Sequence, residues 1–296
     1  MKITGAGRPP SLIATSAAPP SAAPTGPTLW AVSDLHIQYL ANREVAAAIT
    51  ADHPGDWLIV AGDIGDPEDI DWLWSQLRPR FAGIGWVPGN HDLWVRSSSS
   101  TPDSEQRYRE LVELARRHGV LTPDDPWPVL ETDQGPRHLV LLLTLYDYSF
   151  LPPGQLDAPT ALRSARDRGI VFTDEFLLRP GPYGTVDAWC RQRVAGSAAR
   201  LDRLGPADRT ILVNHYPLTD RPIGWYREPA LGLWSGTRAT QRWPWDYRAS
   251  AVVYGHQHIP HHYREDGVDF HEVSLGYPRE RGSRTWHPRA ICPLLS

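Results

Sequence analysis

Five short segments of the chain carry the side chains that could perform chemistry, and each follows directly after an apolar run. Together they contain two kinds of oxygen ligand and several imidazoles: Asp34, His36, Asp63, Asn90, His91, Asp92, His215, His256 and His258. Carboxylate, imidazole and amide oxygen are the ligand types suited to Mn, Fe, Zn or Mg. A site for two such ions, about 3.5–4 Å apart, requires a carboxylate that bridges them. The segments therefore predict a dinuclear metal site.

A β-strand is predicted immediately before each of these segments, so the polar residues stand at strand ends. The strands with their polar ends read TLWAVSD, WLIVAGD, GIGWVPGNHD, TILVNHYP and SAVVYGHQH. A further strand is expected over residues 138–145 and a hairpin over 263–273, with helices over 42–51, 68–77, 104–118 and 186–204. In layered α/β folds, ligand sites form at the carboxyl ends of the strands. The five segments should therefore meet at one edge.

The blocks SDLH, AGDIGD, GNHD, VNHYP and GHQH, in this order, resemble the calcineurin-like metallophosphoesterase superfamily. The resemblance runs from about residue 31 to residue 258 and covers most of the chain. It implies an α/β fold, a four-layer α/β/β/α sandwich with mixed sheets and a small cap insertion. It also implies a hydrolase that cleaves a phosphate ester by attack of a hydroxide shared between two metal ions.

The resemblance also implies a role for each residue of the site. The first metal would be bound by Asp34, His36 and His258. The second metal would be bound by Asn90, His215 and His256. Asp63 would bridge both ions. His91 would reach the phosphate and its leaving group, and Asp92 would orient His91. His256 and His258 are two positions apart, which on an extended segment places both on the same side. Among Mn, Fe, Zn and Mg, we expect manganese.

The domain organisation follows from composition. Residues 1–27 are rich in Ala, Pro, Ser and Gly and are predicted to be a disordered tail, followed by one metallophosphoesterase domain over 28–296. Residues 146–184 are predicted to be a loop-rich, cap-like insertion, and residues 219–248 a substrate loop. Arginine suits phosphate recognition and aromatic faces stack on rings. The candidate substrate-binding residues are Tyr148, Arg221, Trp225 and Arg227, with packing of the loop as the alternative.

Composition limits the class of protein further. A net charge of −4 does not favour general nucleic-acid binding, and no apolar run is long enough to span a bilayer. The only lysine is Lys2, which excludes a Walker A loop and a Schiff-base lysine within the fold. Cys190 and Cys292 form no metal-binding pair and are expected to be reduced thiols. We therefore expect a cytoplasmic enzyme; the oligomeric state is left open.

Three functions are compatible with these residues. The first expectation is a phosphomonoesterase that acts on a small phosphorylated molecule. The alternative is a phosphodiesterase that acts on a cyclic nucleotide or another nucleotide-type ester, because the same metal chemistry serves both. A remote third possibility is a non-catalytic binding protein on the same fold, since fold alone does not determine function. Every expected ligand and His91 are present, which argues for catalysis.

Overall fold

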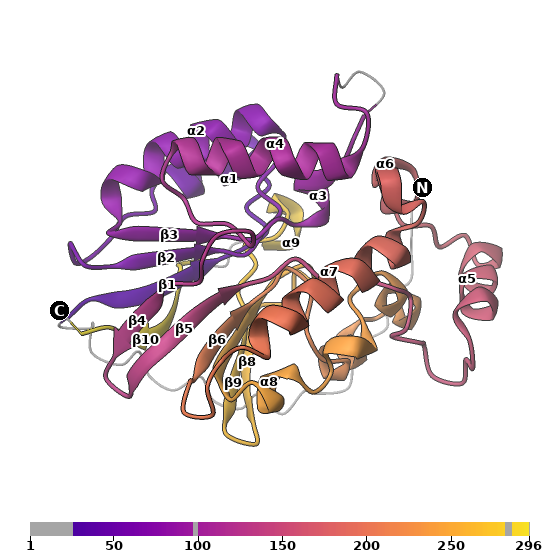
Figure 1. Ribbon diagram of the computed structural model, residues 1–296. Coiled ribbons are helices and arrows are strands. Elements are labelled where there is room, and N and C mark those ends of the chain that lie inside the picture. The colour runs from indigo at the N-terminus through magenta and orange to yellow at the C-terminus, as the bar shows by residue number, and fades with distance from the viewer. Residues whose placement is uncertain (1–25, 97–99, 282–285, 296) are drawn as a thin grey trace.

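The computed structural model describes residues 26–96, 100–281 and 286–295, so the predicted tail lies, up to residue 25, outside the described residues. Two β-sheets stack face to face at the centre of the molecule (Figure 1). The first sheet has the order β10–β1–β2–β3. Its strands are β1 (Thr28–Val32), β2 (Trp57–Val60), β3 (Gly83–Trp86) and β10 (Arg289–Pro293). β1, β2 and β3 are parallel and β10 is antiparallel, so the sheet is mixed.

The second sheet is larger and also mixed, with the order β4–β5–β6–β7–β9–β8. Its strands are β4 (Val129–Thr132), β5 (Gly135–Leu141), β6 (Thr210–Val213), β7 (Ala249–Tyr254), β8 (His261–Glu265) and β9 (Val268–Glu272). The four central strands run parallel, and each edge strand pairs antiparallel with its neighbour. The expected hairpin over 263–273 is therefore present as β8 and β9.

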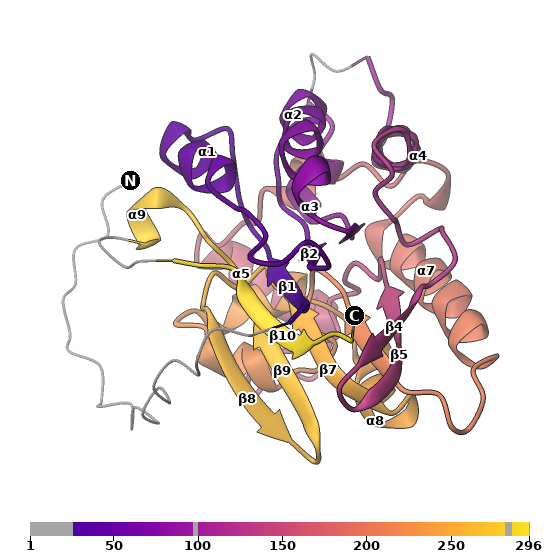
Figure 2. The same cartoon turned by 90° about the vertical axis from the view of Figure 1, so that its left-hand side faces the viewer.

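Helices cover the outer faces of both sheets (Figures 1 and 2). The first sheet is covered by α1 (Leu40–Ala47), α2 (Pro67–Leu77) and α4 (Ser104–Arg117), and the second by α7 (Val186–Leu201) and α8 (Trp243–Asp246). Side chains that alternate along β1 pack on both faces of the sheet. Leu29 and Ala31 pack between the two sheets, whereas Val32 packs in the core beneath the helices, so both faces are covered. The predicted four-layer α/β/β/α fold is confirmed.

The two predicted insertions contain regular structure. Residues 146–184 contain α5 (Ala158–Asp167) and α6 (Asp174–Leu177), and α5 projects from the side of the molecule (Figure 1). Residues 219–248 contain three 3₁₀ helices, Arg221–Trp225, Pro229–Trp234 and Arg238–Thr240, followed by α8. The short helix α3 (Asn90–Leu93) contains three of the predicted site residues, and the short helix α9 (Pro278–Arg281) follows β9.

Several boundaries differ from those predicted. The strand expected over 138–145 covers 135–141, and the chain then leaves the sheet and reaches Leu145 with a φ of 56°. Helix α5 was not predicted in the loop-rich segment, although Asp157 caps it by accepting a hydrogen bond from Thr160 N at 2.8 Å. The edge strands β4 and β10 were also missed, because short edge strands carry a weak period-two pattern.

Candidate metal centre

The predicted ligands converge at the carboxyl ends of β1, β2, β3, β6 and β7. In three groups, one ligand atom from each residue lies within 4.8 Å of the others. These groups are Asp34, His36 and His258; His36, Asp63 and His91; and Asp34, Asp63 and His215. Segments far apart in the sequence thus bring imidazole and carboxylate atoms to one place. This is expected because ligand sites in layered α/β folds form where the carboxyl ends of the strands meet.

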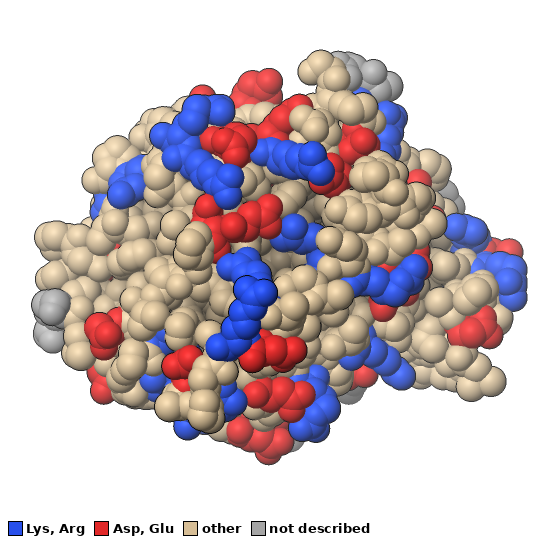
Figure 3. Space-filling view, viewed as in Figure 1, with Lys and Arg blue, Asp and Glu red and all other residues tan. Residues whose placement is uncertain are grey.

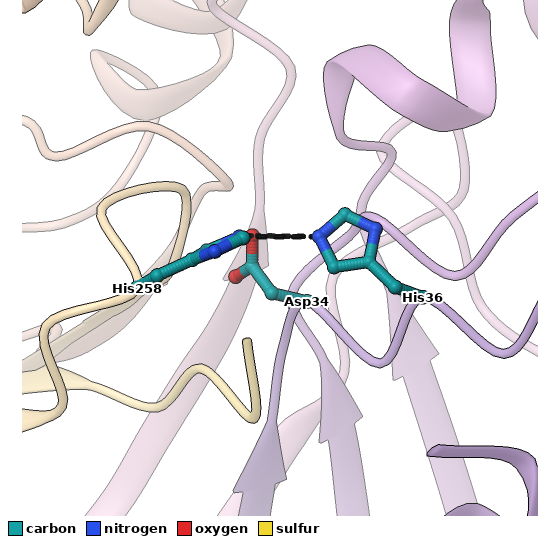
Figure 4. Close-up of side chains that lie close together, drawn as sticks. All are labelled: Asp34, His36 and His258. Atoms are coloured by element: carbon teal, nitrogen blue, oxygen red, sulfur yellow. Dashed lines mark hydrogen bonds and ion pairs between the residues drawn. The ribbon is translucent and has the colours of Figure 1, made fainter. Parts of the chain in front are cut away.

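The first group joins the end of β1 to the end of β7 (Figure 4). His258 Nε2 lies 3.0 Å from Asp34 Oδ1 and 3.1 Å from His36 Nε2. Two imidazole nitrogens and a carboxylate oxygen therefore face a common point. His36 Nδ1 is buried without a hydrogen-bond partner in the described part of the chain. This donor set fits a divalent cation.

The second group joins the ends of β3, β6 and β7. His215 Nε2 lies 3.2 Å from Asn90 Oδ1 and 3.3 Å from His256 Nδ1. Asp63 stands between the two groups, with Oδ1 at 3.6 Å from His215 Nε2 and Oδ2 at 3.9 Å from His36 Nε2. One carboxylate thus presents one oxygen to each group, which is the arrangement that a bridging ligand requires.

Most of these residues have an unusual backbone conformation. Positive φ angles, between 42° and 70°, occur at five of the seven predicted ligands: Asp34, His36, Asp63, His256 and His258. Such conformations cost about 1–3 kcal/mol each and are characteristic of active sites. Gly62 and Gly89 lie where the loops after β2 and β3 meet, and a Cβ on either would overlap the other loop. The turns at the strand ends therefore hold the predicted ligands in place at a cost in backbone conformational energy.

Outer contacts hold the imidazoles in place. His258 Nδ1 donates to Glu280 Oε2 at 2.7 Å, and His215 Nδ1 donates to the Ala61 carbonyl at 2.8 Å. Asp34 Oδ2 accepts from Ser274 Oγ at 2.7 Å. An imidazole that donates from one nitrogen presents the other to a metal with a fixed orientation. In both histidines the nitrogen left for the metal is Nε2.

Burial and neighbouring charges perturb the titration of these groups. Burial and the nearby carboxylates of Asp34 and Asp92 raise the pKa of Asp63 well above its usual range. Burial lowers the pKa of His36 to about 3. Burial also opposes the charge on His258, but the carboxylates of Asp34 and Glu280 outweigh it and raise the pKa of His258 to about 10. The metal-free centre therefore holds protons that a bound metal must displace.

We expect the binding of Mn²⁺ to release protons at neutral pH. His258, with its pKa raised to about 10, is protonated there and must become neutral to act as a ligand. Deprotonation is easier at higher pH, so the apparent affinity should rise with pH until His258 is neutral without the metal. Calorimetric titrations in two buffers with different heats of ionisation measure the released protons. Equal observed enthalpies in both buffers would contradict the prediction.

His91 lies at the open side of the cluster, with 15% of its side chain exposed. Its ring stacks on Trp94, with centroids 3.6 Å apart and an angle of 29° between the planes. His91 Nε2 lies 3.8 Å from Asp63 Oδ2 and 3.4 Å from the Tyr277 hydroxyl. The imidazole thus faces the space beside Asp63 with its ring position set by Trp94.

Asp92 has partners other than the expected His91. Its carboxylate accepts four backbone N–H groups, at 2.8–3.1 Å: those of Asp63, Ile64, Gly65 and Gly89. No hydrogen bond joins it to the His91 ring within the described residues. The carboxylate ties the loop after β2 to the loop after β3. Asp92 therefore supports the backbone that carries Asp63 and Asn90.

We expect Asp92→Asn to lower the free energy of unfolding by about 1–3 kcal/mol, because an amide leaves buried backbone donors without an acceptor. The orienting role that the resemblance implied would instead produce a weaker version of the turnover loss caused by removing His91. Urea unfolding, together with turnover on esters with good and poor leaving groups, distinguishes the two roles. Unchanged stability with a selective loss on the poor leaving group would restore the orienting role.

Sequence analysis also missed residues that contact the predicted site, among them three within the described ranges. Tyr277 stacks on His36 with centroids 4.5 Å apart, Glu280 bonds to His258, and Asp174 bonds to Asn90. Tyr277 could have been predicted as a site residue, because it follows β9, which runs parallel beside β7, and ligand sites form at the carboxyl ends of such strands. Nothing local in the sequence marks Asp174.

Three of the four candidate substrate-binding residues contact other parts of the molecule, and the fourth is exposed. Arg221 pairs with Glu265 at 3.1 Å, and Trp225 packs on His261 with centroids 4.0 Å apart, so both lie against β8. The Tyr148 hydroxyl donates to Glu175 at 3.3 Å, and Arg227 is exposed. Among the contacts of the described residues, none joins these four to a predicted metal ligand.

The surface and the helices also bear on the expected partners. On the face shown in Figure 3, basic and acidic side chains are interspersed. This differs from the basic stripe typical of nucleic-acid binding proteins. No helix in the described ranges has the length and apolar character needed to cross a membrane.

The fold and the cluster define a metallophosphoesterase, and a family model supports this. The chain belongs to the calcineurin-like phosphoesterase family, whose model matches residues 27–260. It is therefore an enzyme of the phosphoric ester hydrolase class, as the resemblance implied, and the family implies divalent metal ions.

Individual relatives are more specific. The chain is 47% identical, over 86% of its length and 79% of the relative's, to the [Acyl-carrier-protein] phosphodiesterase PptH of Mycobacterium tuberculosis. It also matches the crystal structure of Phosphopantetheinyl Hydrolase (PptH) from Mycobacterium tuberculosis, with a TM-score of 0.86 and 45% identity. That match covers 90% of this chain and 96% of the other.

Proposed function

We propose that this enzyme hydrolyses the phosphodiester that links phosphopantetheine to a carrier protein. The observation that carries the proposal is the 47% identity, over 86% of the chain, to an acyl-carrier-protein phosphodiesterase. The relative favours the phosphodiester alternative over the expected phosphomonoester. It also favours a protein-bound substrate over a free small molecule.

In this proposal, two divalent ions occupy the cluster. Asp34, His36 and His258 would hold one, Asn90, His215 and His256 the other, and Asp63 both. When bound, such ions lower the pKa of water and neutralise phosphoryl oxygens. The chain's own contribution is to hold the ligands in place through Glu280, the Ala61 carbonyl and Ser274.

His91 is proposed to act on the leaving group. Hydrolysis adds the oxygen of water to phosphorus and breaks the bond between phosphorus and the carrier-protein oxygen, which leaves with a proton. Both alcohols of such a diester are alkyl alcohols, which are poor leaving groups, so a proton or hydrogen bond from His91 Nε2 is worth most here. The exposed edges of His91 and His258, 15% and 14%, mark the side from which the substrate would approach.

The test uses purified enzyme with Mn²⁺ and a carrier protein bearing phosphopantetheine. Mass spectrometry should show the carrier reduced by one phosphopantetheinyl group, with phosphopantetheine released. Aryl phosphate monoesters, aryl phosphodiesters and a cyclic nucleotide are assayed in parallel, and Asp63→Asn serves as the inactive control. Cleavage of a monoester or a cyclic nucleotide, with the loaded carrier left intact, would overturn the proposal.

A further inference from the structure

Helix α6 places a buried carboxylate behind the predicted metal centre. Asp174 has no exposed surface, and it belongs to the 146–184 segment, which supplies none of the predicted ligands. Its Oδ1 accepts two hydrogen bonds, from Asn90 Nδ2 at 2.9 Å and from Trp94 Nε1 at 2.7 Å. One oxygen thus joins the segment to the first residue of helix α3 and to the residue that follows the helix.

The bond to Asn90 decides which way its amide points. An ionised carboxylate only accepts hydrogen bonds, so the amide must turn its NH₂ group toward Asp174. Asn90 Oδ1 then points the other way and lies 3.2 Å from His215 Nε2. Only the oxygen of an amide suits a divalent cation, so this orientation is the one that a ligand requires.

The bond to Trp94 acts on the other functional group. The Trp94 ring stacks on the His91 imidazole with centroids 3.6 Å apart. Trp94 has a single N–H donor, and Asp174 Oδ1 accepts it, which fixes the rotation of the indole. The plane against which His91 rests is therefore set by the same oxygen that orients Asn90.

We propose that Asp174 is a positioning residue that aligns the metal ligand Asn90 and, through Trp94, the leaving-group residue His91. The inference rests on the proposed roles of Asn90 and His91 in ester hydrolysis, and it does not depend on the carrier protein as substrate. It gives the 146–184 segment a function at the metal centre, because a shift of α6 would disturb both groups together.

The test compares Asp174→Ala with Asp174→Asn. Without an acceptor, Asp174→Ala should bind Mn²⁺ about 10–100-fold more weakly, the usual effect of losing an outer-shell partner. It should also lose more turnover on methyl phenyl phosphate than on methyl 4-nitrophenyl phosphate, because a misplaced His91 matters more for the poorer leaving group. Asp174→Asn keeps an acceptor oxygen and should retain most of the Mn²⁺ affinity.

Glu175→Ala is the matched control. Glu175 is the next residue of α6, and its carboxylate accepts from Trp234 Nε1 at 2.8 Å, from the Tyr148 hydroxyl and from Arg166. Truncation to alanine breaks these bonds, and none of them reaches Asn90 or Trp94. Its Mn²⁺ affinity should stay near wild type. Equal losses in Glu175→Ala and Asp174→Ala, or wild-type Mn²⁺ affinity and leaving-group ratio in Asp174→Ala, would overturn the proposal.

If Asp174→Ala fails to fold, Trp94→Phe decides the question. This variant keeps a ring against His91 but removes the N–H group that Asp174 holds. A selective loss on methyl phenyl phosphate, with Mn²⁺ affinity retained, supports the proposal. An unchanged ratio of the two turnover rates contradicts it. All these measurements use Mn²⁺ and simple diesters, so their failure is distinct from a failure to cleave a carrier protein.

Discussion

Asp63→Asn is expected to abolish the metal pair and with it nearly all turnover. The two carboxylate oxygens of Asp63 face different ligand groups, His215 Nε2 at 3.6 Å and His36 Nε2 at 3.9 Å. An amide offers one oxygen, so it can serve one ion and presents an NH₂ group to the other. Loss of an outer-shell partner costs up to about 100-fold, and loss of a shared ligand should cost at least that much. Elemental analysis and the turnover of methyl 4-nitrophenyl phosphate measure both effects.

Asp66→Asn provides the matched control for this variant. Asp66 lies three residues further along the same loop, is half exposed, and pairs with Arg96 at 3.7 Å. The same loss of charge there should leave metal content and turnover near wild type. If Asp63→Asn retained two metals per chain, the bridging assignment would be wrong, whatever its activity.

The convergence of the predicted ligands was predictable because these residues obey a local rule. Each predicted ligand follows a parallel strand, and the carboxyl ends of such strands meet at one edge. The identity and order of the polar residues then suffice to place Asp34, Asp63 and His215 together without knowledge of any long-range contact. The four layers followed from the resemblance of the five blocks to a known superfamily, because the alternation of strands and helices along the chain indicates by itself only a layered α/β fold.

The partners of the buried carboxylates were beyond reach of the sequence. The resemblance implied that Asp92 orients His91, yet the Asp92 carboxylate accepts hydrogen bonds from four backbone N–H groups. Asp174 reaches Asn90 across 84 positions of the chain. The path of the backbone decides which side chains come into contact. The sequences of the loops and of the 146–184 segment have no periodic pattern from which that path could be predicted.

The substrate-binding candidates illustrate the same limit. Arginine and tryptophan in the 219–248 segment, which lies between the His215 and His256 blocks, suggested recognition of phosphate and rings. In the structure, the Arg221 guanidinium lies over Tyr263, 4.7 Å from the ring centroid, and Trp225 covers His261. The chemistry suggested by these residue types is used within the protein, between the segment and β8. Tyr277, which contacts His36 and His91, lies outside both predicted insertions.

Removal of the His91 imidazole should slow hydrolysis by about 10²–10⁴-fold where the leaving group is an alkyl alcohol. For methyl 4-nitrophenyl phosphate the loss should be smaller, because a good leaving group departs with little help from an acid. The comparison therefore uses His91→Ala on that ester, on methyl phenyl phosphate and on the loaded carrier protein. His118→Ala is the control, since His118 pairs with Asp71, which lies on α2.

Metal content decides between two roles that the geometry allows for His91. Its imidazole lies with His36 and Asp63 in a group that could hold a metal ion, so a ligand role is a real alternative. A residue that acts on the leaving group can be removed without loss of metal, because the seven predicted ligands remain. A metal ligand cannot be removed without loss of metal, and its removal should slow the hydrolysis of all esters to a similar degree. Full metal content with an unequal loss supports the leaving-group role. A missing metal with equal losses identifies His91 as a ligand. The action on the departing oxygen must then be assigned to another group, and the Tyr277 hydroxyl, 3.4 Å from His91 Nε2, is a candidate.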